Sequence, residues 1–173
     1  MHEGKHCEIE RKYLIAPPDA AFLQRQPGCA VWTIEQIYLT AEPGATRRIR
    51  RVTENGQDRF YKTFKRRLSD LSAEEDEGLI ARDEYESRRL EADPALHPVY
   101  KTRYRVPFAG QTLEFDVYPF WNDRAILEIE LESESQTPIL PEWVRVYREV
   151  TADHRYKNVR LAAEVPMDSL PAE

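Results

Sequence analysis

The segment CEIERKYLI, residues 7–15, carries charged side chains at every second position: Glu8, Glu10 and Lys12. Successive side chains of a β-strand point to opposite faces of a sheet. A strand over these residues would therefore present two carboxylates and an ammonium group on one face. The same alternation recurs in later segments of the chain, and it decides the fold that we predict.

Length and composition indicate one folded domain. The chain has 173 residues, enough for one domain with a hydrophobic core, so we expect a single domain over residues 1–173. Hydrophobic residues make up 41% of the chain, which is enough to form a core. The formal net charge is −6, whereas general nucleic-acid binders present a basic surface. We therefore expect no nucleic-acid partner.

Targeting signals are absent from the sequence. The N-terminus has no apolar signal segment, and no window approaches the roughly 18 consecutive apolar residues of a membrane span. The two cysteines, Cys7 and Cys29, lack metal-ligand spacing, and we expect no disulfide framework. These observations predict a cytoplasmic protein without a membrane partner.

Eight segments have the alternation or the composition of β-strands. They cover residues 8–15, 34–40, 45–53, 58–66, 82–90, 100–108, 112–120 and 125–133. Asn55-Gly56 separates two of them and is a strong signal for a two-residue hairpin turn. Eight antiparallel strands can close a barrel. We predict a mainly β (α+β) protein built on a closed eight-stranded antiparallel β-barrel.

A few helices should flank the barrel. Helical spacing is found over residues 17–26, 141–150 and 153–164, and Asp153 is a suitable N-cap for the last of these. The acidic segment at 69–81 interrupts the composition of the chain, and we expect it to form an exposed loop or a short helix.

Charges of one sign tend to share a face within each predicted strand. Acidic pairs occur at Glu8/Glu10, Glu84/Glu86, Glu114/Asp116 and Glu128/Glu130, and basic pairs at Arg48/Arg50 and Lys101/Arg103. For any one strand, a polar face in contact with solvent is the simplest explanation. The segregation of signs, and the near absence of Ser, Gln and Asn from these faces, favour a second arrangement. In it, the charged faces point into a closed barrel and the apolar faces point outward.

Such an interior would suit phosphate chemistry. Buried charges must pair, bind ions or retain water. Carboxylate pairs attract hard cations such as Mg²⁺ or Mn²⁺, and arginine grips two phosphate oxygens at once. A metal ion opposite a Lys/Arg clamp is the arrangement that phosphoryl transfer uses. The sequence contains no glycine-rich phosphate-binding loop.

The motifs and their order resemble the CYTH superfamily, also called triphosphate tunnel metalloenzymes, in its bacterial single-domain type. EIERKYL at 8–14 resembles the Glu-x-Glu-x-Lys signature of that family. Similar matches follow in order: QIYL at 36–39, RIRR at 48–51, TFK at 63–65, RDEYE at 82–86, KTRY at 101–104, EFDVY at 114–118, LEIELES at 127–133 and REVTADHRYKN at 148–158. The resemblance covers about residues 6–162, which we take as the core of the domain.

The resemblance implies a tunnel that binds a linear triphosphate and needs a divalent metal, Mg²⁺ or Mn²⁺. It implies catalytic roles for Glu8, Glu10 and Lys12. It implies that the triphosphate is bound by Lys12, Arg48, Arg50, Lys65, Arg82, Lys101 and Arg103, with Lys157 as a further contact unless its side chain faces solvent. The metal or its water would be held by Glu8, Glu10, Glu128 and Glu130, and the acidic wall would be completed by Glu84, Glu86, Glu114 and Asp116 as ligands or as orienting groups.

The leading hypothesis for function is metal-dependent hydrolysis of a linear triphosphate, with inorganic tripolyphosphate as the substrate. The alternatives are hydrolysis of an organic triphosphate (ATP or thiamine triphosphate) and a class IV-type adenylate cyclase. A non-catalytic polyphosphate-binding module is disfavoured, because binding a polyanion alone does not call for so many carboxylates. The expected partner is a small-molecule triphosphate, and the sequence leaves a monomer and a homodimer open.

Overall fold

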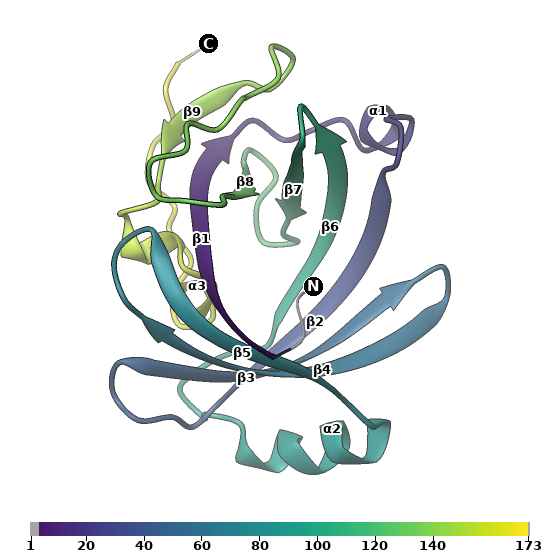
Figure 1. The fold of residues 1–173 in the computed structure, drawn as a ribbon, viewed down its shortest axis with the longest axis vertical. Coiled ribbons are helices and arrows are strands. Elements are labelled where there is room, and N and C mark those ends of the chain that lie inside the picture. Colours follow the sequence, from purple (N-terminus) through teal and green to yellow (C-terminus); the bar gives the residue numbers. More distant parts are fainter. Residues whose placement is uncertain (1–3, 173) are drawn as a thin grey trace.

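The computed structural model describes residues 4–172, and its dominant feature is one antiparallel sheet that closes on itself (Figure 1). The strands are β1 (Gly4–Ile15), β2 (Ala30–Leu39), β3 (Ala45–Glu54), β4 (Gln57–Arg67), β5 (Ser72–Ile80), β6 (Val99–Phe108), β7 (Gln111–Val117), β8 (Ala125–Glu130) and β9 (Val146–Glu149). The helical elements are α1 (Ala20–Gln24), α2 (Arg82–Arg88), η1 (Arg89–Glu91), η2 (His154–Tyr156) and α3 (Asn158–Leu161).

The long strand β1 closes the barrel. Its first half, from Gly4 to Ile9, pairs with β5, and its second half, from Glu10 to Ile15, pairs with β8. The strand order is therefore β5-β4-β3-β2-β6-β7-β8-β1 and back to β5, while β9 pairs with β1 outside this ring. The predicted closed eight-stranded antiparallel barrel is confirmed.

The predicted hairpin between β3 and β4 is also confirmed. Asn55 and Gly56 form its two-residue turn with φ of 50° and 76°. Both values lie in the left-handed region, which Asn and Gly tolerate better than other residues. The turn fixes the register of the two strands, so that Arg48 lies opposite Thr63 and Arg50 opposite Tyr61.

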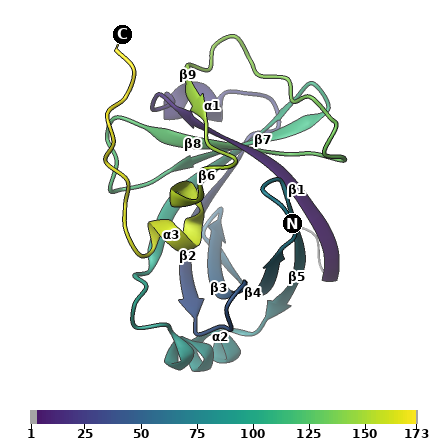
Figure 2. The same cartoon turned by 90° about the vertical axis from the view of Figure 1, so that its left-hand side faces the viewer.

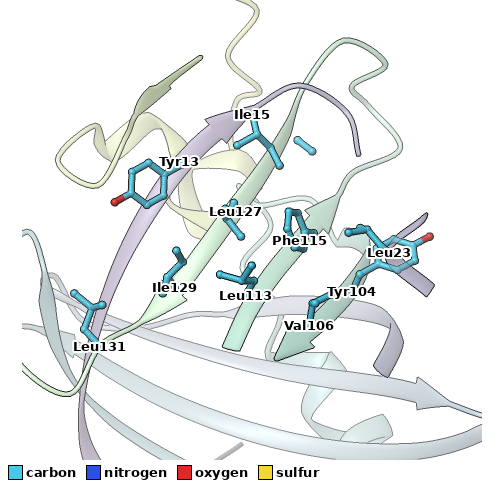
Figure 3. Close-up of a cluster of buried hydrophobic side chains, with 11 residues drawn as sticks. Tyr13, Ile15, Leu23, Tyr104, Val106, Leu113, Phe115, Leu127, Ile129 and Leu131 are labelled. Atoms are coloured by element: carbon cyan, nitrogen blue, oxygen red, sulfur yellow. The ribbon is translucent and has the colours of Figure 1, made fainter. Parts of the chain in front are cut away.

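The apolar faces of β1, β6, β7 and β8 point away from the barrel interior. Figure 3 shows their cluster, whose buried members include Tyr13, Ile15, Tyr104, Val106, Leu113, Phe115, Leu127 and Ile129. Leu23 of α1 packs into it, and so do Leu140 and Val144 of the segment before β9 and Val146, the first residue of β9. These residues alternate with charged ones along each strand, so the charged faces point inward. The alternation predicted from the sequence is therefore present in the barrel.

The C-terminal segment covers one end of the barrel (Figure 2). Tyr156 and Leu161 pack there against Leu14, Tyr38 and Ile126 in a second apolar cluster. The hydroxyl of Tyr118 donates a hydrogen bond of 2.6 Å to Oδ1 of Asn158 and so anchors the start of α3. Within residues 4–172, no helix is long and apolar enough to cross a membrane.

The prediction of a strand at 82–90 is wrong, because residues 82–88 form helix α2 outside the barrel. Asp83 and Glu84 lie in its first turn and Arg88 in its last, which suits the helix dipole. Arg88 also pairs with Glu84 one turn earlier. Tyr85 is the buried residue of the helix, and it packs on Phe60 of β4 with ring centroids 4.9 Å apart.

The prediction of a loop or short helix at 69–81 is wrong as well, because residues 72–80 form strand β5. Ala73, Glu75 and Glu77 are buried along this strand, whereas Glu74 and Asp76 are exposed. Pairing with β4 on one side and β1 on the other holds this acidic segment extended. Neighbouring strands have overridden its low intrinsic strand propensity.

Of the three predicted helices, one is present, one is a strand and one is interrupted. Residues 20–24 form α1, capped by the side chain of Asp19, which accepts a hydrogen bond from the backbone of Phe22. Residues 146–149 form strand β9, so the helix predicted over 141–150 is wrong. The helix predicted over 153–164 is broken at Lys157, whose extended backbone (ψ 138°) separates η2 from α3. Asp153 caps η2, as predicted, by accepting from the backbone of Arg155.

Candidate functional site

A basic wall is formed by the inward faces of β3, β4 and β6. Arg48 and Arg50 come from β3, Lys65 from β4, and Lys101 and Arg103 from β6. The strand register aligns them in space, because Arg48 lies opposite Thr63 on β4 and Arg103 opposite Trp32 on β2. All of these cations were predicted site residues, and the structure brings them to one interior.

An acidic wall faces them from β1, β7 and β8. Glu8, Glu10 and Lys12 lie on β1, and Lys12 lies opposite Glu128 of β8 in register. Glu114 of β7 in turn lies opposite Glu128. Asp116 is fully buried one step further along β7. The predicted acidic residues of these three strands therefore share the interior with the basic wall.

Arg103 holds the two walls together. Its Nε and Nη2 donate to Asp116 at 2.7 and 2.8 Å, Nη2 also donates to Glu128 at 2.9 Å, and Nη1 donates to Glu114 at 3.1 Å. Burial raises the pKa of Asp116, but Arg103 and Lys101 outweigh it, and the net pKa lies below the usual range. Asp116 is therefore held ionised by cations at hydrogen-bond distance.

Lys101 is a buried cation of the basic wall with a lowered pKa. Its Nζ donates to Asp116 at 2.7 Å and lies 3.5 Å from Oδ1 of Asn158. Burial, followed by the charge of Arg103, lowers the pKa of Lys101 to about 8 despite the attraction of Asp116. An incoming anion beside Lys101 would favour its charged form.

Lys12 lies on the acidic side of the interior. Its Nζ is 3.2 Å from Oε1 of Glu128 and 3.9 Å from Oε1 of Glu10, and it donates to the carbonyl oxygen of Tyr156 at 3.3 Å. One ammonium group is thus shared between two carboxylates and the C-terminal segment. The pKa of Lys12 is raised, because Glu128 and Glu10 outweigh the effect of burial.

Glu10 has more negative charge around it than positive charge to balance it. Burial, then Glu128 and Glu8, raise its pKa to about 7, while Lys12 and Lys65 act in the opposite direction. Glu8 differs, because Lys65 donates to its Oε2 and holds its pKa below the usual value despite burial. A cation placed among Glu8, Glu10 and Glu128 would relieve this repulsion.

The donor set fits a hard divalent cation. Carboxylate oxygens are the ligands that Mg²⁺ and Mn²⁺ prefer, and Oε1 of Glu128 is buried without a hydrogen bond. In residues 4–172 no three His, Cys, Asp or Glu side chains already converge as a metal-binding group. The fit therefore rests on the raised pKa of Glu10 beside Glu128 and Glu8, and on the buried Oε1 of Glu128, whose neighbour is Nζ of Lys12 at 3.2 Å. Glu130 lies opposite Glu10 in register, at the exposed end of β8.

Sequence reasoning missed two interior carboxylates, Glu75 and Glu77 of β5. Glu77 accepts hydrogen bonds of 2.7 Å from both Arg50 and Thr63. Glu75 lies 3.6 Å from Arg48 and has a buried Oε2 without a hydrogen bond. The Glu-x-Glu spacing was a usable signal, but the acidic residues at 74 and 76 concealed the alternation.

Three predicted site residues lie outside the interior. Arg82, Glu84 and Glu86 are on helix α2 at the outer surface, where Arg82 and Glu86 are exposed and Glu84 is half-buried. Arg82 pairs with Asp58, and Glu84 pairs with Arg88. The prediction that these three residues line the interior is wrong, because they lie on a helix outside the barrel and not on one of its strands. Glu77 and Glu75 take the places in the acidic wall that were assigned to Glu84 and Glu86.

A cavity of about 310 Å³ opens from the charged interior to the surface. Glu8, Glu10 and Lys65 line it from the barrel, and Lys157 and Arg160 from the C-terminal segment. Burial lowers the pKa of Lys157, and the charge of Lys12 adds to this effect. Lys157 therefore lies at the mouth of the interior rather than on a fully solvated helix face.

Known proteins are similar to this chain in sequence and in architecture. An inorganic triphosphatase of Nitrosomonas europaea is 32% identical over an alignment of 174 positions that covers 92% of this chain and 99% of that protein. The crystal structure of the inorganic triphosphatase NE1496 is 30% identical, with a TM-score of 0.56 over 92% of this chain and 96% of that one. PH1819 from Pyrococcus horikoshii OT3 shares the fold at 23% identity, with a TM-score of 0.57 over 74% and 80% of the two chains.

No family model matches the chain. The family assignment therefore rests on the full-length relative, on the closed barrel and on the charged interior. Membership of the inorganic triphosphatase's family implies that a divalent metal ion is needed. The chain belongs to the CYTH superfamily of triphosphate tunnel metalloenzymes.

Proposed function

We propose that this protein is a hydrolase that cleaves inorganic tripolyphosphate inside its barrel, with Mg²⁺ or Mn²⁺ as the divalent cofactor. The observation that carries the proposal is the meeting of two walls, where Glu8, Glu10 and Glu128 face a row of buried lysines and arginines. A linear polyanion and a divalent cation satisfy both walls together. The name of the Nitrosomonas europaea relative, an inorganic triphosphatase, supports the same substrate.

The basic wall would bind the triphosphate. Arg48, Arg50 and Arg103 offer planar forks that match phosphate oxygens, and Lys65 and Lys101 offer point charges. In the free protein, carboxylates hold several of these groups in place, as Glu77 holds Arg50 at 2.7 Å. Such pre-ordering lowers the entropic cost of binding substrate.

The acidic wall would hold the metal and orient water. Glu8, Glu10, Glu128 and Glu130 are the proposed ligands or water-positioning groups. Asp116 is instead engaged by Arg103 and Lys101, so its proposed role is to orient the basic wall. When bound, the metal ion supplies neutralisation of phosphate charge and activation of water.

Cleavage requires a water oxygen to attack a terminal phosphorus while the bridging P–O bond breaks. The products are orthophosphate and pyrophosphate. The leaving pyrophosphate gains negative charge in the transition state, and the cations of the basic wall would stabilise it. Lys12, between Glu10 and Glu128, would contact the phosphate nearest the acidic wall.

The basic and acidic walls are built within one closed barrel, so a monomer or a homodimer would serve this chemistry. We further propose that residues 1–173 act as one domain whose partner is a small-molecule triphosphate, and that the protein is cytoplasmic.

A substrate panel tests the proposed function. Purified protein is incubated with Mg²⁺ or Mn²⁺ and with tripolyphosphate, pyrophosphate, ATP or thiamine triphosphate, and the products are separated by ion chromatography. We expect orthophosphate and pyrophosphate from tripolyphosphate, and none after chelation of the metal. Cyclic AMP from ATP would show a cyclase instead, and binding without turnover of any substrate would show a binding module.

A further inference from the structure

Two segments far apart in sequence meet across the mouth of the cavity. The end of β4 contributes Arg67, the turn between β4 and β5 contributes Asp70, and η2 contributes His154. Arg67 contacts Asp70, its Nη2 lies 2.6 Å from Nε2 of His154, and that same ring nitrogen lies 3.2 Å from Oδ1 of Asp70. We call these three residues the clasp. In Figure 1 the β4–β5 turn lies beside the C-terminal segment that carries α3.

The turn is held in place from a second side. Ser69 and Ser72 both donate from their hydroxyls to Oε1 of Glu134, at 3.1 and 2.9 Å. The backbone amides of Leu68 and Ser69 both donate to the carbonyl oxygen of Ser72 at 3.0 Å. The β4–β5 turn is therefore a constrained support, and the clasp joins it to the C-terminal segment.

The other end of the barrel interior is filled by apolar side chains. Trp32, Ile34, Val52 and Tyr61 form a buried cluster there. Thr46 of β3 and Lys65 of β4 line the mouth of the cavity. Along β3 from Thr46, the chain passes Arg50 before it reaches Val52, and Tyr61 of β4 likewise lies farther from the mouth than Lys65. A group attached to a triphosphate in the interior therefore meets this cluster in one direction and the clasp in the other.

The space under the clasp suits a small ligand. The cavity volume of about 310 Å³ is at the lower end of the roughly 300–1,000 Å³ typical of small-molecule sites. Gly44, Ala45, Thr46 and Val159 supply small side chains to its wall, and its lining residues include no Phe, Tyr or Trp. Nucleobases are commonly bound by stacking on such rings. His and Arg side chains stack on bases as well, and in this lining His154 and Arg67 are already in contact with each other within the clasp.

We propose that the clasp determines substrate specificity: it admits an unsubstituted triphosphate and rejects one that carries a nucleoside or further phosphates. This inference rests on the proposed function and names its selectivity element. The clasp spans the path that such a substituent would occupy. Opening it would remove the obstruction without changing the walls of the interior.

The test compares two double variants that change net charge alike. Asp70→Ala/His154→Ala removes both partners of Arg67 in the clasp, and all three side chains are substantially exposed, so the barrel core is left intact. Asp76→Ala/His97→Ala is the matched control, because both residues are exposed and neither lines this cavity. The measured quantity is kcat/KM for ATP and for tetrapolyphosphate, each divided by kcat/KM for tripolyphosphate.

We expect both ratios to rise about tenfold in the clasp variant, which corresponds to about 1.4 kcal/mol of lost discrimination, and to stay unchanged in the control. Unchanged ratios in the clasp variant would overturn the inference, and so would wild-type protein that cleaves ATP as efficiently as tripolyphosphate.

A binding experiment separates this inference from the proposed function. Isothermal titration of metal-free protein, in the presence of chelator, gives the affinities for ATP and for tripolyphosphate without turnover. The clasp variant should shift their ratio toward ATP by about tenfold. If tripolyphosphate is not cleaved but this ratio shifts, the proposed function is wrong and the role of the clasp in ligand specificity is supported. If the ratio does not shift, the clasp is refuted whatever the enzyme hydrolyses.

Discussion

Arg50 of β3 donates a hydrogen bond of 2.7 Å from Nη2 to Oε2 of Glu77 on β5, across the intervening strand β4. Thr63 of β4 donates to the same oxygen at 2.7 Å, so three adjacent strands meet at one carboxylate. Glu77 is 2% exposed and Arg50 is 3% exposed. The contact therefore lies inside the barrel, and it identifies β5 as part of the charged interior.

Substitution of Glu77 by Gln should lower the free energy of unfolding by about 3–5 kcal/mol. Removing one partner of a buried ion pair leaves the other charge desolvated, here Arg50. Urea unfolding followed by tryptophan fluorescence measures the change. The matched control is Glu84→Gln, since Glu84 lies on α2 outside the barrel interior and its substitution should leave the unfolding midpoint almost unchanged. A larger loss of stability in Glu84→Gln than in Glu77→Gln would contradict the placement of Glu77 inside the barrel.

Substitution of Arg48 by Ala should weaken triphosphate binding more than it slows the chemical step. Its Nη2 lies 3.6 Å from Glu75 and 3.8 Å from Glu77, distances too long for hydrogen bonds, and its Nε is buried without a hydrogen bond. A charge-assisted contact to phosphate is worth about 1.5–3 kcal/mol, so KM should rise about 10- to 100-fold.

Two companion variants sharpen that measurement. Arg48→Lys keeps the charge and loses the planar fork, so its KM should fall between those of wild type and Arg48→Ala. Arg66→Ala removes a cation from the exposed part of β4 and should leave KM near the wild-type value. A KM for Arg48→Ala equal to that of Arg66→Ala would remove Arg48 from the binding wall.

Asp153 should give the protein a contribution to stability that is lost in acid. Hydrogen bonding from the side chain of Arg155, together with weaker effects, lowers the pKa of Asp153 to about 2. Because the pKa is lower in the folded protein than in the unfolded chain, the contribution is present above about pH 4 and disappears as the pH falls to about 2. Since Asp153 is partly solvated, its size should be about 0.5–1 kcal/mol.

Asp153→Asn isolates this effect, because the amide oxygen can still cap η2 while the charge is removed. Thermal unfolding of wild type and variant is compared at several pH values between 2 and 7. The variant should be less stable at pH 6 and equal to wild type at pH 2. A difference that does not change with pH would assign the role of Asp153 to capping alone.

Much of the barrel follows from alternation in the sequence. Glu128 lies between Leu127 and Ile129, and Asp116 follows Phe115, so a single strand already separates a charged face from an apolar one. Closure of the sheet then requires one of these faces to be the interior. Apolar residues of α1 that match the outer face decide which face points outward.

Alternation alone did not predict which acidic segment forms the fifth strand of the barrel: residues 72–80 form β5, whereas residues 82–88 form α2. The Glu-x-Glu spacing occurs both at 75 and 77 and at 84 and 86, so local pattern alone does not choose between them. The choice depends on long-range pairing of residues 72–80 with β4 and β1. Residues 82–88 lack such partners and take the helical state that their own side chains favour.

Glu10 provides the most direct measurement of whether the barrel interior hydrolyses triphosphate. Release of orthophosphate from tripolyphosphate, with Mg²⁺ or Mn²⁺, is measured for wild type, Glu10→Gln and Glu84→Gln, and circular dichroism confirms that each is folded. We expect metal-dependent turnover in wild type and in Glu84→Gln, and a loss of about 100-fold or more in Glu10→Gln. Turnover by Glu10→Gln at the wild-type rate would contradict hydrolysis at the acidic wall.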